Sequence, residues 1–125
     1  MASPARPRPR RRPAEVKAEA ALGAAIDRAR RDHGVPALRA SAPLTLAARG
    51  HSVDLRDSGR CSHDGSDGSS LADRLARLDI TLQRYGEVVA CGAASADAAV
   101  EQWLDSRAHR AIVLGATYRS IGVGV

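Results

Sequence analysis

Among the residues of this chain that could do chemistry are two histidines and a carboxylate, His63, His109 and Glu87, which are singled out by the sequence motifs described below. Two neutral imidazoles and a carboxylate can bind Zn²⁺ or a similar divalent cation and leave a coordination position for water. A cation bound in this way lowers the pKa of that water toward neutrality and supplies a hydroxide nucleophile. Glu87 could instead hydrogen-bond to one imidazole and orient it. The three residues lie far apart in the sequence, and no His-Glu-x-x-His helix is present, so spacing alone does not bring them together.

Other candidate groups give weaker signals. Several serines lie near acidic residues, but no Gly-x-Ser-x-Gly turn exposes one of them as a nucleophile. A serine-rich loop is more typical of turn and capping hydrogen bonds, and the serines weighed here are Ser62, Ser66, Ser69, Ser70 and Ser106. His33 and His51 fall on the apolar faces of predicted helices, where a hydrogen-bonded histidine of the core or its boundary is the simpler interpretation.

Helices are expected to form much of the structure that positions these residues. Apolar residues at helical spacing predict helices over residues 14–33, 44–58 and 96–105. Gly34 and Gly59 are natural stops for the first two, and Ser95 is a natural cap for the third. Ser70 and Asp73 form a variant capping box that predicts a short helix with three leucines on one side. A helical turn is expected over residues 107–114.

Extended structure is expected in two places. Residues 79–92 are rich in β-branched residues and Tyr85, interrupted by Gly86. Residues 118–125 predict a strand in which Ile121 and Val123 alternate with glycines. The polar segment 59–70 between helices is a loop by composition. Helices flanking a few strands indicate a mixed α/β sandwich.

Length and charge narrow the class of protein. A chain of 125 residues fits one domain. The net charge of +5 comes from five arginines within residues 1–13, and from residue 14 onward basic and acidic residues balance. The tail alternates proline with arginine, so we expect residues 1–13 to be disordered and residues 14–125 to form the domain. Because the domain has no basic stripe and few aromatics, a nucleic-acid partner is not expected.

Membrane and export signals are absent from the readable pattern. No apolar run reaches the roughly 18 residues that a membrane span requires. A signal peptide needs an uninterrupted apolar core after its basic start, and here Glu15, Lys17 and Glu19 follow the arginines.

Five segments, in sequence order, resemble the bacterial branch of the CAP superfamily (cysteine-rich secretory, antigen 5 and PR-1 proteins). They are "LTLAARGHSVDL" at 44–55, "CSHDGSDGSS" at 61–70, "YGEVVACG" at 85–92, "WLDSRAHRAIVL" at 103–114 and "YRSIGVGV" at 118–125. Each motif alone is weak, but five in the right order and spacing form a strong signal. The resemblance implies an α+β fold, a three-layer α-β-α sandwich around a small antiparallel sheet. Since relatives continue beyond the position of Val125, this sheet is expected to lack its final strand.

The resemblance also implies a shared cavity lined by His63, Glu87 and His109, with Ser106 at its rim. The cavity would place Cys61 near Cys91. A disulfide between them is the first expectation, and two buried thiols or a Cys/His zinc site are the alternatives. The chain departs from the family pattern where Val88, Ala108 and Ile112 replace the usual Asn, Gly and Asn. The lost amides leave the cavity less preorganised.

The sequence therefore predicts a monomeric CAP domain that acts outside the cytoplasm and binds a ligand or partner in this cavity. One alternative is a divalent-metal hydrolase using His63, Glu87 and His109, and another is a lipid-binding protein. No cofactor other than zinc or a similar cation is expected.

Overall fold

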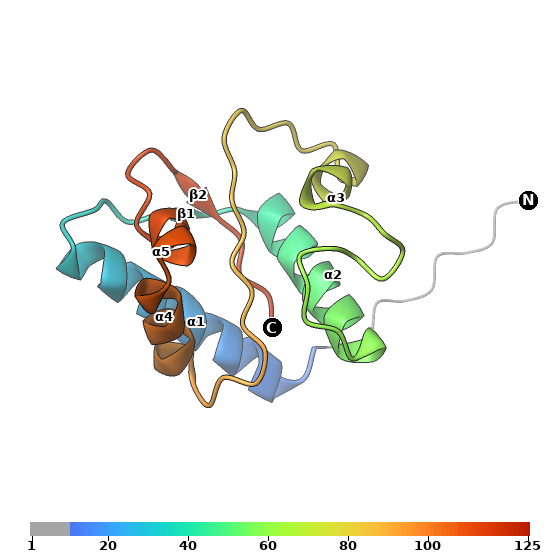
Figure 1. The fold of residues 1–125 in the computed structure, drawn as a ribbon, viewed down its shortest axis with the longest axis horizontal. Helices are drawn as coiled ribbons and strands as arrows, with labels where there is room; N and C mark the ends of the chain where they lie inside the picture. Colours follow the sequence, from blue (N-terminus) through green and yellow to red (C-terminus); the bar gives the residue numbers. More distant parts are fainter. Residues whose placement is uncertain (1–10) are drawn as a thin grey trace, which may run out of the picture.

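The computed structural model describes residues 11–125, so most of the predicted tail lies outside the described residues. Within them the chain forms helices and one pair of short strands (Figure 1). In order, these elements are α1 (Pro13–Asp32), β1 (Arg39–Ala40), α2 (Ala42–Ser58), α3 (Leu71–Arg77), α4 (Ala96–Asp105), α5 (Arg107–Val113) and β2 (Ser120–Ile121). No helix in residues 11–125 combines the length and the apolar character that a membrane crossing would need.

The helix ends follow the signals in the sequence. Gly59 ends α2 in the left-handed conformation with φ of 69°, which glycine adopts without steric cost. Ser70 and Asp73 form the expected capping box at α3, and the Ser95 hydroxyl accepts a hydrogen bond from the Ala98 amide at α4. Helix α2 begins two residues before the predicted start because Ser41 caps it, accepting a hydrogen bond from the Leu44 amide.

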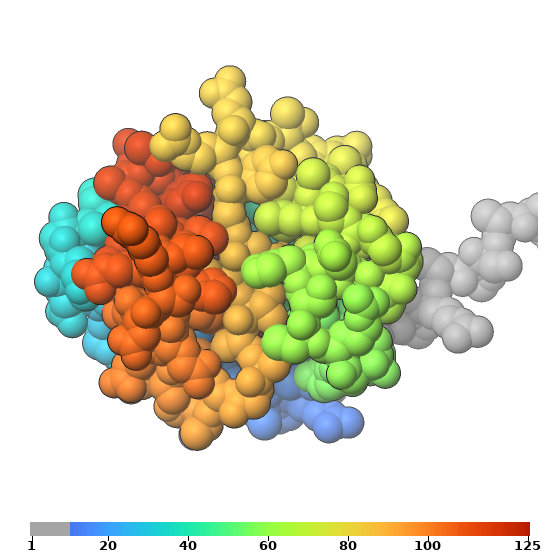
Figure 2. Space-filling view, in the orientation of Figure 1, coloured from blue at the N-terminus to red at the C-terminus, as the bar shows by residue number. Residues whose placement is uncertain are grey.

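The helices form two groups with extended chain between them. Helix α4 packs against both α1 and α5, whereas α3 packs against α2. Residues 79–95 run between these groups, which Figure 2 shows as a yellow to orange band across one face. The hydrophobic core lies in the first group and consists of Ala25, Ile26, Ala29, Ala99, Val100, Trp103 and Val113. The α+β fold expected from the sequence is confirmed.

The pairing inside the sheet differs from the expected antiparallel arrangement. Strands β1 and β2 pair in parallel, with Arg39 beside Ser120 and Ala40 beside Ile121. In the described chain, residues 81–94 make no backbone–backbone hydrogen bond, so this extended segment is not a strand. Residues 122–125 lie against α2 instead of continuing the ladder. A Cβ on Gly122 would overlap the backbone of Leu44, and one on Gly124 would overlap the backbone of Ala48 and Arg49.

One buried charge holds the first helical group to its neighbouring loops. The Arg30 side chain is fully buried and donates hydrogen bonds to the carbonyl oxygens of Pro36 (2.8 Å), Val113 (2.8 Å) and Gly115 (3.1 Å). Two of these carbonyls lie at the end of α5, where the helix dipole is negative. Burial lowers the pKa of Arg30, and Asp27 partly offsets this effect. Arg30 therefore fixes where α5 ends, just before the chain turns toward β2.

Candidate functional site

The loop between α2 and α3 carries His63, and a disulfide fixes its position. Cys61 bonds to Cys91 with their Cα atoms 6.1 Å apart, which confirms the first of the three expectations for these cysteines. The Asp54 carboxylate accepts hydrogen bonds from the Ser66 amide (2.8 Å) and hydroxyl, and Asp67 accepts one from the Ser69 amide (2.9 Å). The loop is thus held by covalent and polar contacts to α2, to itself and to the segment that carries Glu87.

His63 and Glu87 meet as the family resemblance predicts. The Nδ1 atom of His63 lies 2.8 Å from Oε1 of Glu87. The Glu87 side chain is 16% exposed, whereas that of His63 is 55% exposed. The His63 imidazole is therefore largely open to solvent, whereas the Glu87 carboxylate is mostly buried.

Arg74 completes this cluster, and the sequence reasoning missed it. Its guanidinium donates hydrogen bonds to both Glu87 oxygens (2.9 Å and 3.2 Å) and to the His63 carbonyl oxygen (2.5 Å). A signal was present, because Arg74 lies three residues after Leu71 and four before Leu78, on the apolar side of α3. We call His63, Arg74 and Glu87 the carboxylate cluster.

The environment of Glu87 keeps this carboxylate ionised. Burial by itself would raise the pKa of Glu87, but hydrogen bonds from Arg74 and His63 outweigh it, so the pKa lies below its ordinary value. A carboxylate with a lowered pKa and both oxygens hydrogen-bonded is a weak general base near neutral pH. The cluster is better suited to hold structure and present a fixed negative charge than to move protons.

His51 is a buried histidine with one unsatisfied nitrogen. It is 5% exposed, and its Nε2 lies 2.8 Å from the Ser62 carbonyl oxygen. Its Nδ1 is buried and has no hydrogen-bond partner in residues 11–125. The prediction of a hydrogen-bonded core histidine is therefore correct for the burial of His51, but only one of its two ring nitrogens has a hydrogen-bond partner in the described residues. His33 is exposed, with Nδ1 2.8 Å from the Ala29 carbonyl oxygen.

His109 and Ser106 do not join the carboxylate cluster. His109 lies in α5 and Ser106 at the junction of α4 and α5, and no hydrogen bond or ion pair links either side chain to the cluster within the described chain. Among residues 11–125, no group of three or more His, Cys, Asp or Glu side chains is arranged to hold a metal ion. The structure thus brings together two of the three proposed ligands.

A groove of about 1020 Å³ adjoins the carboxylate cluster. Leu82, residues 84–96 and residues 117–125 line it. Apolar side chains from both helical groups complete the wall, among them Leu22, Ile26, Leu44, Leu55 and Trp103. Its charged and ionisable lining residues include Glu87, His51 and four arginines, Arg56, Arg60, Arg84 and Arg119. The volume is at the upper end of the range for small-molecule sites, and an apolar wall with a few polar groups is typical of such sites.

Comparisons with known proteins identify a family and several relatives. Residues 24–125 match the family described as "CAP: Cysteine-rich secretory protein family". An uncharacterised membrane protein of Bacillus subtilis (strain 168), YlbC, is 38% identical over 93 residues, which are 74% of this chain and 27% of that protein. A second B. subtilis protein, YkwD, is 28% identical over 95 residues, which are 76% of this chain and 37% of that one. The chain thus spans 27% to 37% of the length of the curated relatives it matches.

Solved structures share the fold. An extracellular protein containing an SCP domain from Bacillus anthracis is 32% identical, with a TM-score of 0.83 over 89% of this chain and 37% of that one. An outer surface protein from Borrelia burgdorferi has 21% identity and a TM-score of 0.73, covering 81% of this chain and 74% of that chain. A cysteine-rich secretory protein from Staphylococcus aureus has 18% identity and a TM-score of 0.75, covering 94% and 38%. The last two likenesses bear on the fold alone.

Proposed function

The chain belongs to the CAP family in its bacterial branch, and from this premise we propose that it is a binding module that acts outside the cytoplasm. It holds a ligand or a segment of a partner in the groove beside Glu87. The observation that carries the proposal is the groove itself, about 1020 Å³ of largely apolar wall next to a fixed carboxylate. An apolar ligand buried there removes hydrophobic surface from water, and a lipid is one ligand class that such a wall favours.

The disulfide supports a site of action outside the cytoplasm. Disulfides persist in oxidising compartments and are rare in the reducing cytosol. The B. anthracis relative is described as extracellular, which agrees with this placement.

A tryptophan in the wall of the groove makes the proposal testable by fluorescence. Trp103 is the single tryptophan of the chain and lines the groove, with its Nε1 donating to the Val89 carbonyl oxygen at 3.2 Å. We expect the apolar dye 8-anilinonaphthalene-1-sulfonate to bind the folded protein at one site and to change the Trp103 fluorescence.

A pair of variants on α1 controls for nonspecific binding. Ala21 is exposed and lines the groove, whereas Ala24 is exposed on the same helix outside it. Ala21→Phe should narrow the groove and weaken dye binding at least about tenfold, with Ala24→Phe binding like the parent. Equal binding by both variants would refute the groove as the ligand site.

A metal-dependent hydrolase is the second proposal, favoured by the contact between His63 and Glu87. The donors do not fit a metal centre as they are arranged, because no third ligand joins them in residues 11–125 and Arg74 engages both oxygens of Glu87. A zinc titration by calorimetry of the parent, His63→Ala and His109→Ala separates the two proposals. One zinc bound by the parent and lost in both folded variants would favour the hydrolase over the binding module.

A further inference from the structure

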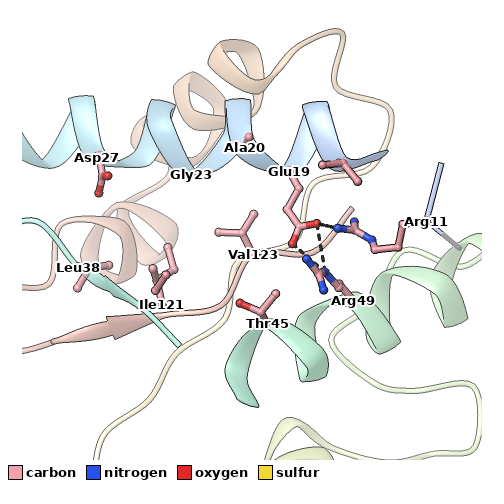
Figure 3. Close-up of a pocket in the computed structure, with 12 residues that line it drawn as sticks. Arg11, Glu19, Ala20, Gly23, Asp27, Leu38, Thr45, Arg49, Ile121 and Val123 are labelled. Carbon is pink, nitrogen blue, oxygen red and sulfur yellow. Dashed lines mark hydrogen bonds and ion pairs between the residues drawn. The ribbon is translucent and has the colours of Figure 1, made fainter. Parts of the chain in front are cut away.

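A second pocket, of about 400 Å³, lies between α1, α2 and the strand pair (Figure 3). It shares Leu38, Ile121 and Val123 with the wall of the large groove, but its charged residues are its own. None of the carboxylate cluster lines it. A ligand bound here would therefore be recognised by different chemistry from one bound beside Glu87.

One end of this pocket carries two arginines around one carboxylate. Arg49 donates from Nε to both Glu19 oxygens (2.9 Å and 3.2 Å), and Arg11 forms an ion pair with the same group. Two arginines and one carboxylate leave one net positive charge at this end. The Glu19 side chain is only 10% exposed.

The arginines also keep unused donors. The Nη2 atom of Arg11 is buried without a hydrogen-bond partner in the described chain, and Arg49 engages Glu19 through Nε alone. An unpaired buried donor is costly, and a ligand carboxylate would satisfy it with a charge-assisted hydrogen bond.

The other end of the pocket carries the opposite charge. Asp27 lines the pocket and makes no hydrogen bond or ion pair that the structure records within residues 11–125. It follows Glu19 by eight residues on α1, a rise of about 12 Å along the helix. Figure 3 places Asp27 at one end and Arg11 with Arg49 at the other, with Ala20 and Gly23 between them.

The middle of the pocket is open because of a glycine. Gly23 lies inside α1, where glycine destabilises a helix relative to alanine. A Cβ at this position would meet nothing within 4 Å, so no steric conflict requires glycine there. Its missing side chain leaves space beside the aliphatic side chains of Leu38, Ile121 and Val123.

We propose that this pocket binds a short peptide with free ends and small aliphatic side chains. The terminal carboxylate lies at Arg11 and Arg49, the terminal ammonium at Asp27, and the side chains against the aliphatic wall. An extended tripeptide spans about 10 Å, which is comparable to the rise of about 12 Å between Glu19 and Asp27 along α1. The volume of the pocket falls within the range for small ligands.

Calorimetry with the full chain and the peptide alanyl-valyl-alanine tests this proposal. We expect one site with a Kd of about 0.1 mM, as is typical for a ligand of this size. Amidation of the carboxyl end and acetylation of the amino end should each weaken binding at least about tenfold. Hexanoate, which has the carboxylate and an aliphatic body but no amine, is the probe for a simple carboxylate site.

Single substitutions test which pocket residue binds each end of the peptide. Arg49→Gln should weaken the free peptide at least about tenfold, and Asp27→Asn should make the free and acetylated peptides bind alike. Gly23→Leu should abolish binding while the protein stays folded by circular dichroism, because the new side chain enters open space. Arg56→Gln is the matched control, since Arg56 lies on the same helix and pairs with Glu15 at 3.3 Å outside the pocket.

Three outcomes would overturn the proposal. They are no binding of the free peptide by the parent, unchanged affinity in folded Gly23→Leu, or hexanoate binding as tightly as the peptide with no effect of Asp27→Asn. The last outcome would leave a carboxylate site and exclude peptide recognition.

Discussion

Glu87 accepts hydrogen bonds from two side chains that approach from different parts of the chain, Arg74 on α3 and His63 in the preceding loop. These contacts stabilise the ionised form and hold its pKa below the ordinary value. A group whose pKa is lower in the folded than in the unfolded protein adds stability above its unfolded pKa. That contribution is lost as the pH falls through the folded pKa.

The acid sensitivity of the fold should therefore depend on this residue. In Glu87→Gln we expect a lower melting temperature than the parent at pH 7, because the charge-assisted hydrogen bonds are lost. The gap in melting temperature should narrow as the pH falls through the lowered pKa of Glu87 in the folded parent, where its carboxylate is also neutralised. Thermal melts from pH 7 to pH 3 measure it. Glu101→Gln, an exposed change on α4, is the control and should keep the parent's profile.

For single residues, the sequence predicted two of the three members of the carboxylate cluster. His63 and Glu87 were predicted through their motifs, whereas Arg74 belongs to none of them and reaches Glu87 only after α3 has packed on α2. The unsatisfied nitrogen of His51 is also a property of the packed structure, because it depends on which groups surround the ring.

Among the elements, the contact between α2 and the final segment of the chain depends on two glycines. Gly122 and Gly124 face α2 so closely that any side chain would overlap its backbone, while Ser52 donates a hydrogen bond to the Gly124 carbonyl oxygen at 3.0 Å. The alternation of glycine with Ile121 and Val123 is thus a docking pattern for a helix, with one face bare and one face apolar.

Gly122→Ala should lower the free energy of unfolding by at least about 2 kcal/mol, because the backbone of α2 would have to move. Gly50→Ala is the matched control. Nothing lies within 4 Å of a Cβ there, and the change should raise stability by about 0.5–1 kcal/mol through helix propensity. Urea unfolding measures both. Equal destabilisation by the two changes would contradict the close approach.

Helices and their caps were predictable because their signals are local, as Ser70 with Asp73 and Gly59 show. Strand pairing was not predictable, because a strand forms only by hydrogen-bonding to a second segment, and the local sequence does not show which segment that is. Residues 79–92 have strand-like composition but form no strand pairing in the described chain. Arg39 and Ala40 lie outside both segments for which extended structure was predicted, and they form β1.

For the whole molecule, the disulfide joins two regions that helix packing leaves separate. Both cysteines are exposed, so replacing them removes the crosslink without opening a cavity. The double variant Cys61→Ser/Cys91→Ser should lose about 3–4 kcal/mol of unfolding free energy in the chain-entropy model. Urea unfolding of the parent with and without dithiothreitol should give the same difference. No change on reduction would mean that the unfolded chain gains little freedom.

The fold class was predictable because five motifs in one chain matched one family. Composition alone does not show how the segments that carry these motifs pack against one another. The small pocket was not predictable, since Glu19 and Arg49 lie 30 residues apart and meet only when α1 and α2 are assembled.

The disulfide also has a consequence for the carboxylate cluster. The covalent ring closed by Cys61 and Cys91 contains His63 two positions inside one end and Glu87 four positions inside the other. Closing such a ring raises the effective concentration of one residue at the other, because few ring conformations keep them apart. Reduction would open this ring and leave the contact between the His63 imidazole and the Glu87 carboxylate to noncovalent forces, chiefly the Arg74 guanidinium, which binds both residues.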